Sequence, residues 1–233
     1  MRTPARQPVR AHNERRQAAL MAAVSQQVRQ ALFASVLVGA DAEAASQDRS
    51  ALTIPRALAS IGPAQLAARH PGGGEARQQA RALYERCLAH YRNVLRAADV
   101  ALGADDVGAA VAAFVAANVE ALHGVQATPE MLLRLEYQLG GVVRSSSGWD
   151  TADGYERQAY FEQMAVIAVL VSEASKQAAA QGPAAVANLK RAARGYLTEL
   201  LGLEPDALTL NATGLVLRAP AAAAGNVSAT PTA

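Results

Sequence analysis

Apolar residues dominate the segment from Asp153 to Ala180. Its centre, Met164–Val171, holds eight consecutive apolar residues. Because many of them are β-branched, the run alone would also suit a buried strand, so its length and flanks must decide. Apolar residues continue on both sides of this run at steps of four and three. In a helix, this spacing places the following residues on one face: Tyr160, Met164, Ile167, Val171, Ala174 and Ala178. The pattern predicts a buried central helix, ended at Gly182–Pro183 because proline cannot continue a helical ladder.

Four further segments carry the helical spacing of apolar residues, and each has a recognisable end signal. We expect these helices at about 75–101, 105–122, 128–142 and 183–202. Asp105 or Asp106 can cap the second of them and Thr128 the third. The stretch 207–217 alternates around a turn at Asn211–Gly214, which is typical of a short hairpin. The predicted fold is therefore all-α, a bundle of about five helices around a buried central helix (about 153–181), with a short C-terminal β-hairpin at 207–217.

Composition divides the chain into four parts. Residues 1–44 are an Arg-rich N-terminal segment, and residues 45–74 form a connector in which Pro and Gly are frequent. The strong apolar periodicity lies in 75–217, which we predict to be a helical domain that folds alone. Residues 218–233 are rich in Ala, Pro, Ser and Thr, a composition that predicts a disordered tail.

The N-terminal segment also has features of an export signal. Ala31–Ala40 is small and apolar, and it is followed by two A-x-A sequences within 40–44. Counted from Met21, this layout matches a secretory signal peptide with cleavage near Glu43 or Ala45. It predicts a periplasmic or secreted location, whereas an amphipathic N-terminal helix of a cytoplasmic protein is the alternative.

The net charge of +2 hides an asymmetry along the chain. Residues 1–29 hold six Arg against Glu14, whereas the remainder has a net charge of −3. We therefore expect no nucleic-acid binding by the folded domain, although the basic N-terminus could contact nucleic acid or an anionic membrane. The longest apolar runs are about half the ~20 residues that a bilayer requires, so no transmembrane span is predicted.

The sequence offers little that predicts a metal or cofactor. Cys87 and His90 share a helix face, but two ligands do not make a zinc site, and a core thiol beside a surface histidine is the favoured interpretation. The phosphate-binding, dinucleotide-binding and nucleophile-elbow motifs are missing from the sequence. We accordingly predict no metal site and no cofactor.

Four polar residues in the predicted helices are weak candidates for a catalytic site, namely Asn118, His123, Arg157 and Glu162. Glu162 is the most informative of them because it lies between Phe161 and Met164 on the central helix. A shielded carboxylate persists only beside a cation or hydrogen-bond donors, so we expect a donor from another helix, such as an Arg of 75–101. A structural ion pair is the favoured interpretation of this residue.

Two stretches resemble a family of uncharacterised bacterial helical proteins, a conserved domain of unknown function. The first runs from Asp105 to Asn118 and on to His123, and the second is Arg157–Glu162 continuing into Met164–Ile167. The resemblance covers about residues 81–217 and implies that the protein is exported, as members commonly are. It implies no activity and no catalytic residue, and the Arg-rich N-terminus departs from it.

Three functions remain open on the sequence. The first is a non-enzymatic, exported helical protein that acts through a protein partner or by forming a homo-oligomer. The second is an enzyme with a polar cleft around Asn118, His123, Arg157 and Glu162. The third is a basic arm, Arg2–Arg16, that binds nucleic acid or an anionic membrane.

Overall fold

The computed structural model describes residues 7–37, 52–55, 59–97 and 105–217. The predicted tail at 218–233 lies outside these residues. The elements, in chain order, are α1 (Gln7–Leu37), α2 (Gly62–Arg69), α3 (Gly74–Ala97), α4 (Val107–His123), α5 (Pro129–Arg144), α6 (Ser147–Thr151), α7 (Gly154–Gln181), α8 (Pro183–Leu201), a 3-10 turn (Pro205–Ala207), β1 (Leu208–Asn211) and β2 (Gly214–Leu217). The predicted all-α class and C-terminal hairpin are confirmed.

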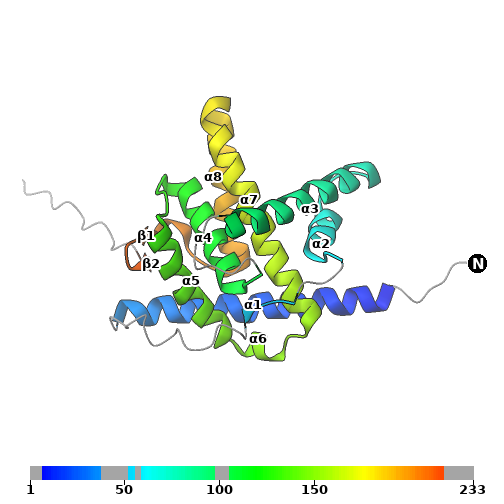
Figure 1. Cartoon of the computed structure of the whole chain (residues 1–233), viewed down its shortest axis with the longest axis horizontal. Coiled ribbons are helices and arrows are strands. Elements are labelled where there is room, and N and C mark those ends of the chain that lie inside the picture. Colours follow the sequence, from blue (N-terminus) through cyan, green and yellow to red (C-terminus); the bar gives the residue numbers. More distant parts are fainter. Residues whose placement is uncertain (1–6, 38–51, 56–58, 98–104, 218–233) are drawn as a thin grey trace, which may run out of the picture.

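Helix α7 is the centre of the bundle, as its apolar pattern predicts. Every residue from Gln158 to Ala168 is buried, and α7 packs against α4 along one side and against α3, α2 and α8 on others. In Figure 1, α1 crosses the base of the molecule, whereas α3 and the ends of α7 and α8 project away from the body. None of the helices that the structure describes is long and apolar enough to cross a membrane.

Side-chain caps set the starts of three helices. The Asp106 carboxylate accepts the Ala109 N–H at the start of α4, and the Thr128 hydroxyl accepts the Met131 N–H at the start of α5. Asp153 and Glu156 form a reciprocal capping box at the start of α7. The caps predicted for the helices at 105–122 and 128–142 are therefore confirmed, and Asp106 is the residue that caps α4.

Helix α1 is part of the hydrophobic core. Leu20 is 3% exposed, and Val24 and Val28 are fully buried against the bundle. Residues 21–37 of the predicted signal peptide lie in this helix. Cleavage near Glu43 would therefore remove core side chains from the mature protein. Independent folding of 75–217 stays a prediction, since both α1 and α2 pack against α7.

Three positions differ from the sequence-based expectation. The helical spacing of apolar residues along 75–101 would place Leu83 and Val94 on a buried face, yet these side chains are 40% and 47% exposed. The reason is that α3 extends past the bundle, so only its middle, around Leu88 and Tyr91, is covered. Conversely, the composition of the polar stretch 145–150 is typical of a loop, yet residues Ser147–Thr151 form the short helix α6, and its Trp149 is buried.

One side chain fastens the hairpin to the bundle. The Gln138 amide on α5 accepts the Leu215 N–H at 2.9 Å and donates to the Leu215 carbonyl at 2.9 Å, so it pairs with β2 as another strand would. Gln138→Leu should cost about 1–3 kcal/mol, because both backbone groups lose their partner. Amide hydrogen exchange at Leu215 measures this, with the exposed Gln177→Leu as control, and unchanged protection would contradict it.

Candidate functional site

The Glu162 carboxylate is buried at the junction of α2, α3 and α7. The residue is 1% exposed, and its Oε2 accepts the backbone N–H groups of Ile61 and Gly62, both at 2.7 Å. Its Oε1 accepts the Gln158 side-chain amide at 2.9 Å. Because the first N–H groups of a helix lack partners inside it, a carboxylate placed there satisfies them and complements the helix dipole. Glu162 therefore caps α2 from a distant part of the chain.

Arg92 on α3 completes this junction. Its Nη2 lies 3.9 Å from Oε1 of Glu162, and its Nε donates to Asp105 at 2.8 Å. Its guanidinium also lies over the Phe161 ring, 5.5 Å from the centroid. An Arg of the 75–101 helix thus lies beside Glu162 as an ion-pair partner, whereas the hydrogen bonds to Glu162 come from two backbone N–H groups at the start of α2 and from Gln158.

The other three candidates each hold a separate partner among the residues that the structure describes. Asn118 is fully buried and donates to the Phe114 carbonyl at 2.7 Å. A ring nitrogen of His123 lies 3.1 Å from the Pro205 carbonyl oxygen. Arg157 donates to the Trp149 carbonyl at 2.8 Å, with its guanidinium over the indole ring. The Asn118 contact stays within α4, whereas those of His123 and Arg157 tie α4 and α7 to other chain segments.

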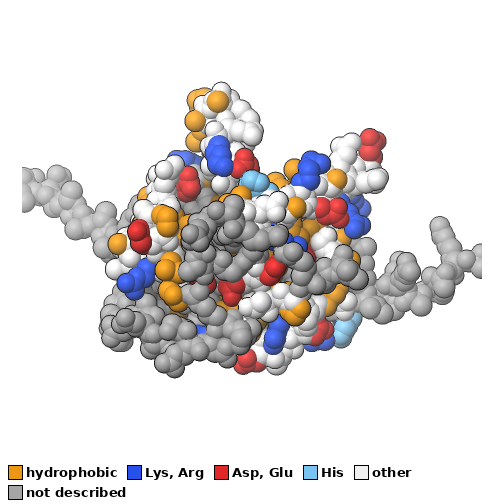
Figure 2. Space-filling view, viewed as in Figure 1, with side chains coloured by type: hydrophobic (Ala, Val, Ile, Leu, Met, Phe, Trp, Pro, Cys, Tyr) orange, Lys and Arg blue, Asp and Glu red, His pale blue; other side chains and the backbone are white. Residues whose placement is uncertain are grey.

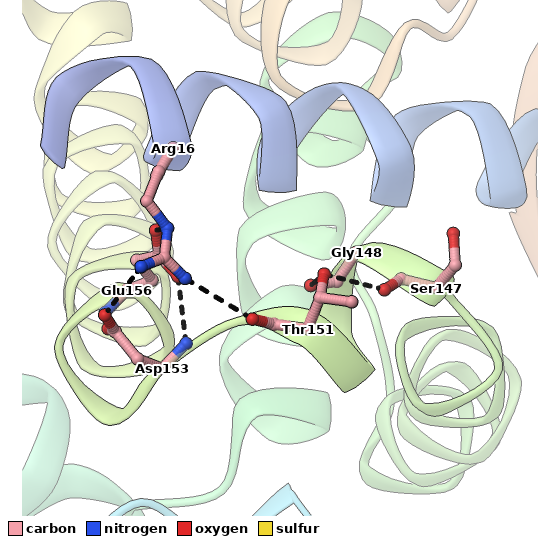
Figure 3. A network of polar contacts seen from close by, with 6 residues as sticks. All are labelled: Arg16, Ser147, Gly148, Thr151, Asp153 and Glu156. Carbon is pink, nitrogen blue, oxygen red and sulfur yellow. Dashed lines mark hydrogen bonds and ion pairs between the residues drawn. The ribbon is translucent and has the colours of Figure 1, made fainter. Parts of the chain in front are cut away.

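A second polar network connects α1 to the start of α7 (Figure 3). The Arg16 guanidinium contacts the Glu156 carboxylate at 2.8 and 3.1 Å, Asp153 at 3.4 Å and the Thr151 carbonyl at 3.4 Å. Glu156 is 3% exposed and belongs to the capping box. The sequence shows that capping box as D-x-x-E, but nothing in it connects the box to Arg16. The positive charge of Arg16 is therefore paired with carboxylates of the same chain.

The surface has a hollow between α3, α4, α5 and α7, which we call the first hollow. Its volume is about 430 Å³, within the range of roughly 300–1,000 Å³ seen for ligand sites. The wall of the first hollow is formed mostly by small and apolar residues: Val94, Ala113, Ala116, Ala117, Ala127, Leu132, Ala168 and Val169. The space-filling view shows α3 and the ends of α7 and α8 as two separate projections, with hydrophobic side chains on the α7–α8 projection (Figure 2).

The first hollow also has a polar rim. Lys176 donates to Glu173 at 2.6 Å, and this hydrogen bond lowers the pKa of the Glu173 carboxyl. The pair is neutral as a unit, so it adds little net charge to the hollow. Glu120, on the opposite wall, has no cation within salt-bridge distance among the described residues. The hollow is therefore apolar inside, with one uncompensated carboxylate at its edge.

A second hollow of about 590 Å³ lies between α4, α7 and α8. It shares Glu120 and Gln126 with the first hollow, so the two meet at the end of α4. The Ser175 hydroxyl in its wall is buried and has no hydrogen-bond partner among the described residues. Its other lining residues include Ala178, Ala179, Val186, Leu189, Lys190 and the sequence-predicted His123.

Cys87 is a core thiol and His90 a surface histidine, as the sequence-based interpretation expects. Cys87 is buried, and burial raises the pKa of its thiol, whereas His90 is exposed at the rim of the first hollow. Within the part of the chain that the structure describes, no group of three or more His, Cys, Asp or Glu side chains could hold a metal ion.

One known protein family matches most of the chain. A model described as a family of unknown function (DUF6683) matches residues 3–218. The chain belongs to this family. No curated protein and no solved structure shows significant similarity to the chain.

The extent of the family match corrects one expectation. The resemblance seen in the sequence covers about 81–217 and treats the Arg-rich N-terminus as a departure. The DUF6683 match begins at residue 3 and so includes α1 with Arg16 and Val24. The physical reason is visible in the fold, because α1 supplies core side chains and the cation beside Glu156.

Proposed function

We propose that this DUF6683 member is a non-enzymatic helical protein that binds an apolar segment of a partner protein in the first hollow. The observation that carries the proposal is the wall of that hollow, which is lined mostly by small apolar side chains and in which Val94 remains 47% exposed. Exposed apolar surface of this kind, rimmed by polar groups, is typical of protein interaction sites.

The partner's chemistry follows from the shape and charge of the wall. Ala113, Ala116 and Ala117 are small, so a helix or extended segment can approach α4 closely. Helix-in-groove recognition uses apolar anchors of this kind. Because Glu120 lacks a cation nearby, a Lys or Arg of the partner at that edge would complement it.

The enzyme alternative has less support from the same residues. Asn118, His123, Arg157 and Glu162 each hold a separate structural partner. The charged pair Glu173–Lys176 at the hollow is internally satisfied. A basic arm that includes Arg16 is also less favoured, since that guanidinium contacts Glu156 and Asp153.

Location enters the proposal through α1. Export by a signal peptide that starts at Met21 would end with cleavage near Glu43, and it would remove Val24 and Val28 from the core. Their burial supports a mature chain that retains α1 and weighs against cleavage near Glu43. N-terminal sequencing of the native protein tests this, and a mature N-terminus at residues 43–45 would reverse it.

The proposal predicts a position-specific cross-link. A photo-reactive benzoylphenylalanine at Val94 should capture one protein in the native host, whereas the same group at Leu83 should not. Both side chains are exposed aliphatics on α3, but only Val94 lines the first hollow. Mass spectrometry of the cross-linked peptide should identify an apolar segment. A synthetic copy should bind Val94→Asp at least about tenfold more weakly than the parent chain.

Two results would contradict the proposal. One is an identical cross-linking pattern at both positions, which would indicate non-specific contacts of α3. The other is equal affinity of the synthetic segment for Val94→Asp and for the parent. Because Val94 is half-exposed, Val94→Asp should leave the fold intact, and circular dichroism checks this.

A further inference from the structure

We infer that the partner's segment occupies both hollows at once and places a Lys or Arg on Glu120, between two apolar side chains. The inference rests on the proposed function, because it names the chemistry of the segment that the first hollow accepts. It adds a second apolar anchoring site, in the second hollow, on the far side of the cation that complements Glu120. The shared position of Glu120 and Gln126 is the starting observation.

The junction between the hollows favours a cation. Helix α4 ends at His123, so its last carbonyl groups lie beside Glu120. The carboxyl end of a helix carries a partial negative charge, which adds to that of a nearby carboxylate. The nearby pair Glu173–Lys176 satisfies itself at 2.6 Å. A cationic side chain that bridges the hollows would therefore meet one full and one partial negative charge.

The second hollow favours an apolar side chain. Val186 and Leu189 are half-buried there, although their spacing on α8 predicts core positions. Lys190 lies in the same wall and would repel a second cation. The charge is thus confined to the junction, with an apolar residue on either side.

Peptide selection tests the inference with a defined probe. Displayed random peptides of about 12 residues, long enough for anchors several residues apart, are selected on the purified full chain, and the selected peptides are then assayed on Val94→Asp. We expect enriched peptides in which Lys or Arg lies between two apolar residues. Synthetic versions should bind Glu120→Gln and Leu189→Asp about tenfold more weakly, the scale of a lost interface anchor. Glu120→Asp should restore most of the affinity, and Glu75→Gln, on the far end of α3, should not change it.

The outcomes separate the inference from the proposed function. Peptides that require Val94 but bind Glu120→Gln and Leu189→Asp normally would overturn the inference and leave the proposed function standing. Selected peptides that are indifferent to Val94→Asp would overturn both. A stable dimer in sedimentation that Glu120→Gln converts to monomer would assign the hollows to a second copy and overturn the inference. Unfolding curves of each variant exclude loss of fold, and the Glu120→Asp rescue provides a second check.

Discussion

Removal of residues 1–44 should lower the free energy of unfolding by about 5 kcal/mol or more, since full burial of one aliphatic side chain contributes roughly 1.5–3 kcal/mol. Three such side chains, Leu20, Val24 and Val28, leave the core with α1. The deletion also takes away Arg16 and leaves the buried Glu156 carboxylate with its capping bonds alone. Urea unfolding of the full chain and of residues 45–233, followed by circular dichroism, measures the difference.

Single substitutions separate the two contributions of α1. Arg16→Ala should cost about 1–3 kcal/mol, the scale of a lost charge-assisted hydrogen bond to a buried group. Arg15→Ala is the matched control, because Arg15 is exposed on the same helix. If residues 45–233 unfold at the same urea concentration as the full chain, α1 is dispensable and the cleaved-leader hypothesis regains its support. The same assay on 75–217 tests the predicted domain boundary.

Glu162→Gln should destabilise the fold by about 1–3 kcal/mol without changing its shape. An amide has one acceptor, whereas the carboxylate accepts on both sides, from the N–H groups of α2 and from Gln158. If the amide oxygen faces α2, its NH₂ group meets the Gln158 amide and the Arg92 guanidinium, which are also donors. Thermal unfolding measures the loss, and the circular dichroism spectrum at low temperature should be unchanged.

The control is Glu173→Gln on the same helix, an exposed carboxylate paired with Lys176, which should change stability by less than about 1 kcal/mol. Gly62→Ala provides an independent test of the junction. A methyl group at Gly62 would lie 2.6 Å from Cβ of Glu162, so α2 would have to shift away from α7. Equal stability of Glu162→Gln and the parent would show that the carboxylate is not needed there.

The sequence predicts those parts of the fold that depend on neighbours along the chain. The step of three and four residues through Met164 identifies α7, and Asp106 and Thr128 mark the starts of α4 and α5. Gly202, with a φ of 61°, ends α8 as a glycine in the left-handed region commonly does. Periodicity and capping are local physics, so one sequence suffices to predict them.

Contacts between distant segments could not be predicted in the same way. Glu162 can be expected to need a donor, but its donors are backbone N–H groups about a hundred positions earlier, which carry no side-chain signal. Arg16 belongs to a segment whose composition indicates a free basic arm. The first hollow depends on how α3 lies against α4 and α7, and the apolar spacing through Leu83 and Val94 does not show which part of α3 is covered.

The contacts of α1 have a consequence for synthesis. This helix is made first, yet the elements that cover it include α8 and β2, which are made last. Roughly 160 residues separate the end of α1 from the end of α8, and at about 5–20 residues per second their translation takes on the order of 10–30 s. The face of α1 that carries Val24 and Val28 has none of its partners until α5, α6 and α7 are made, and its cover is complete only after α8 and β2. An N-terminal apolar segment displayed during translation is available to any factor that recognises nascent chains, even though the finished fold buries it.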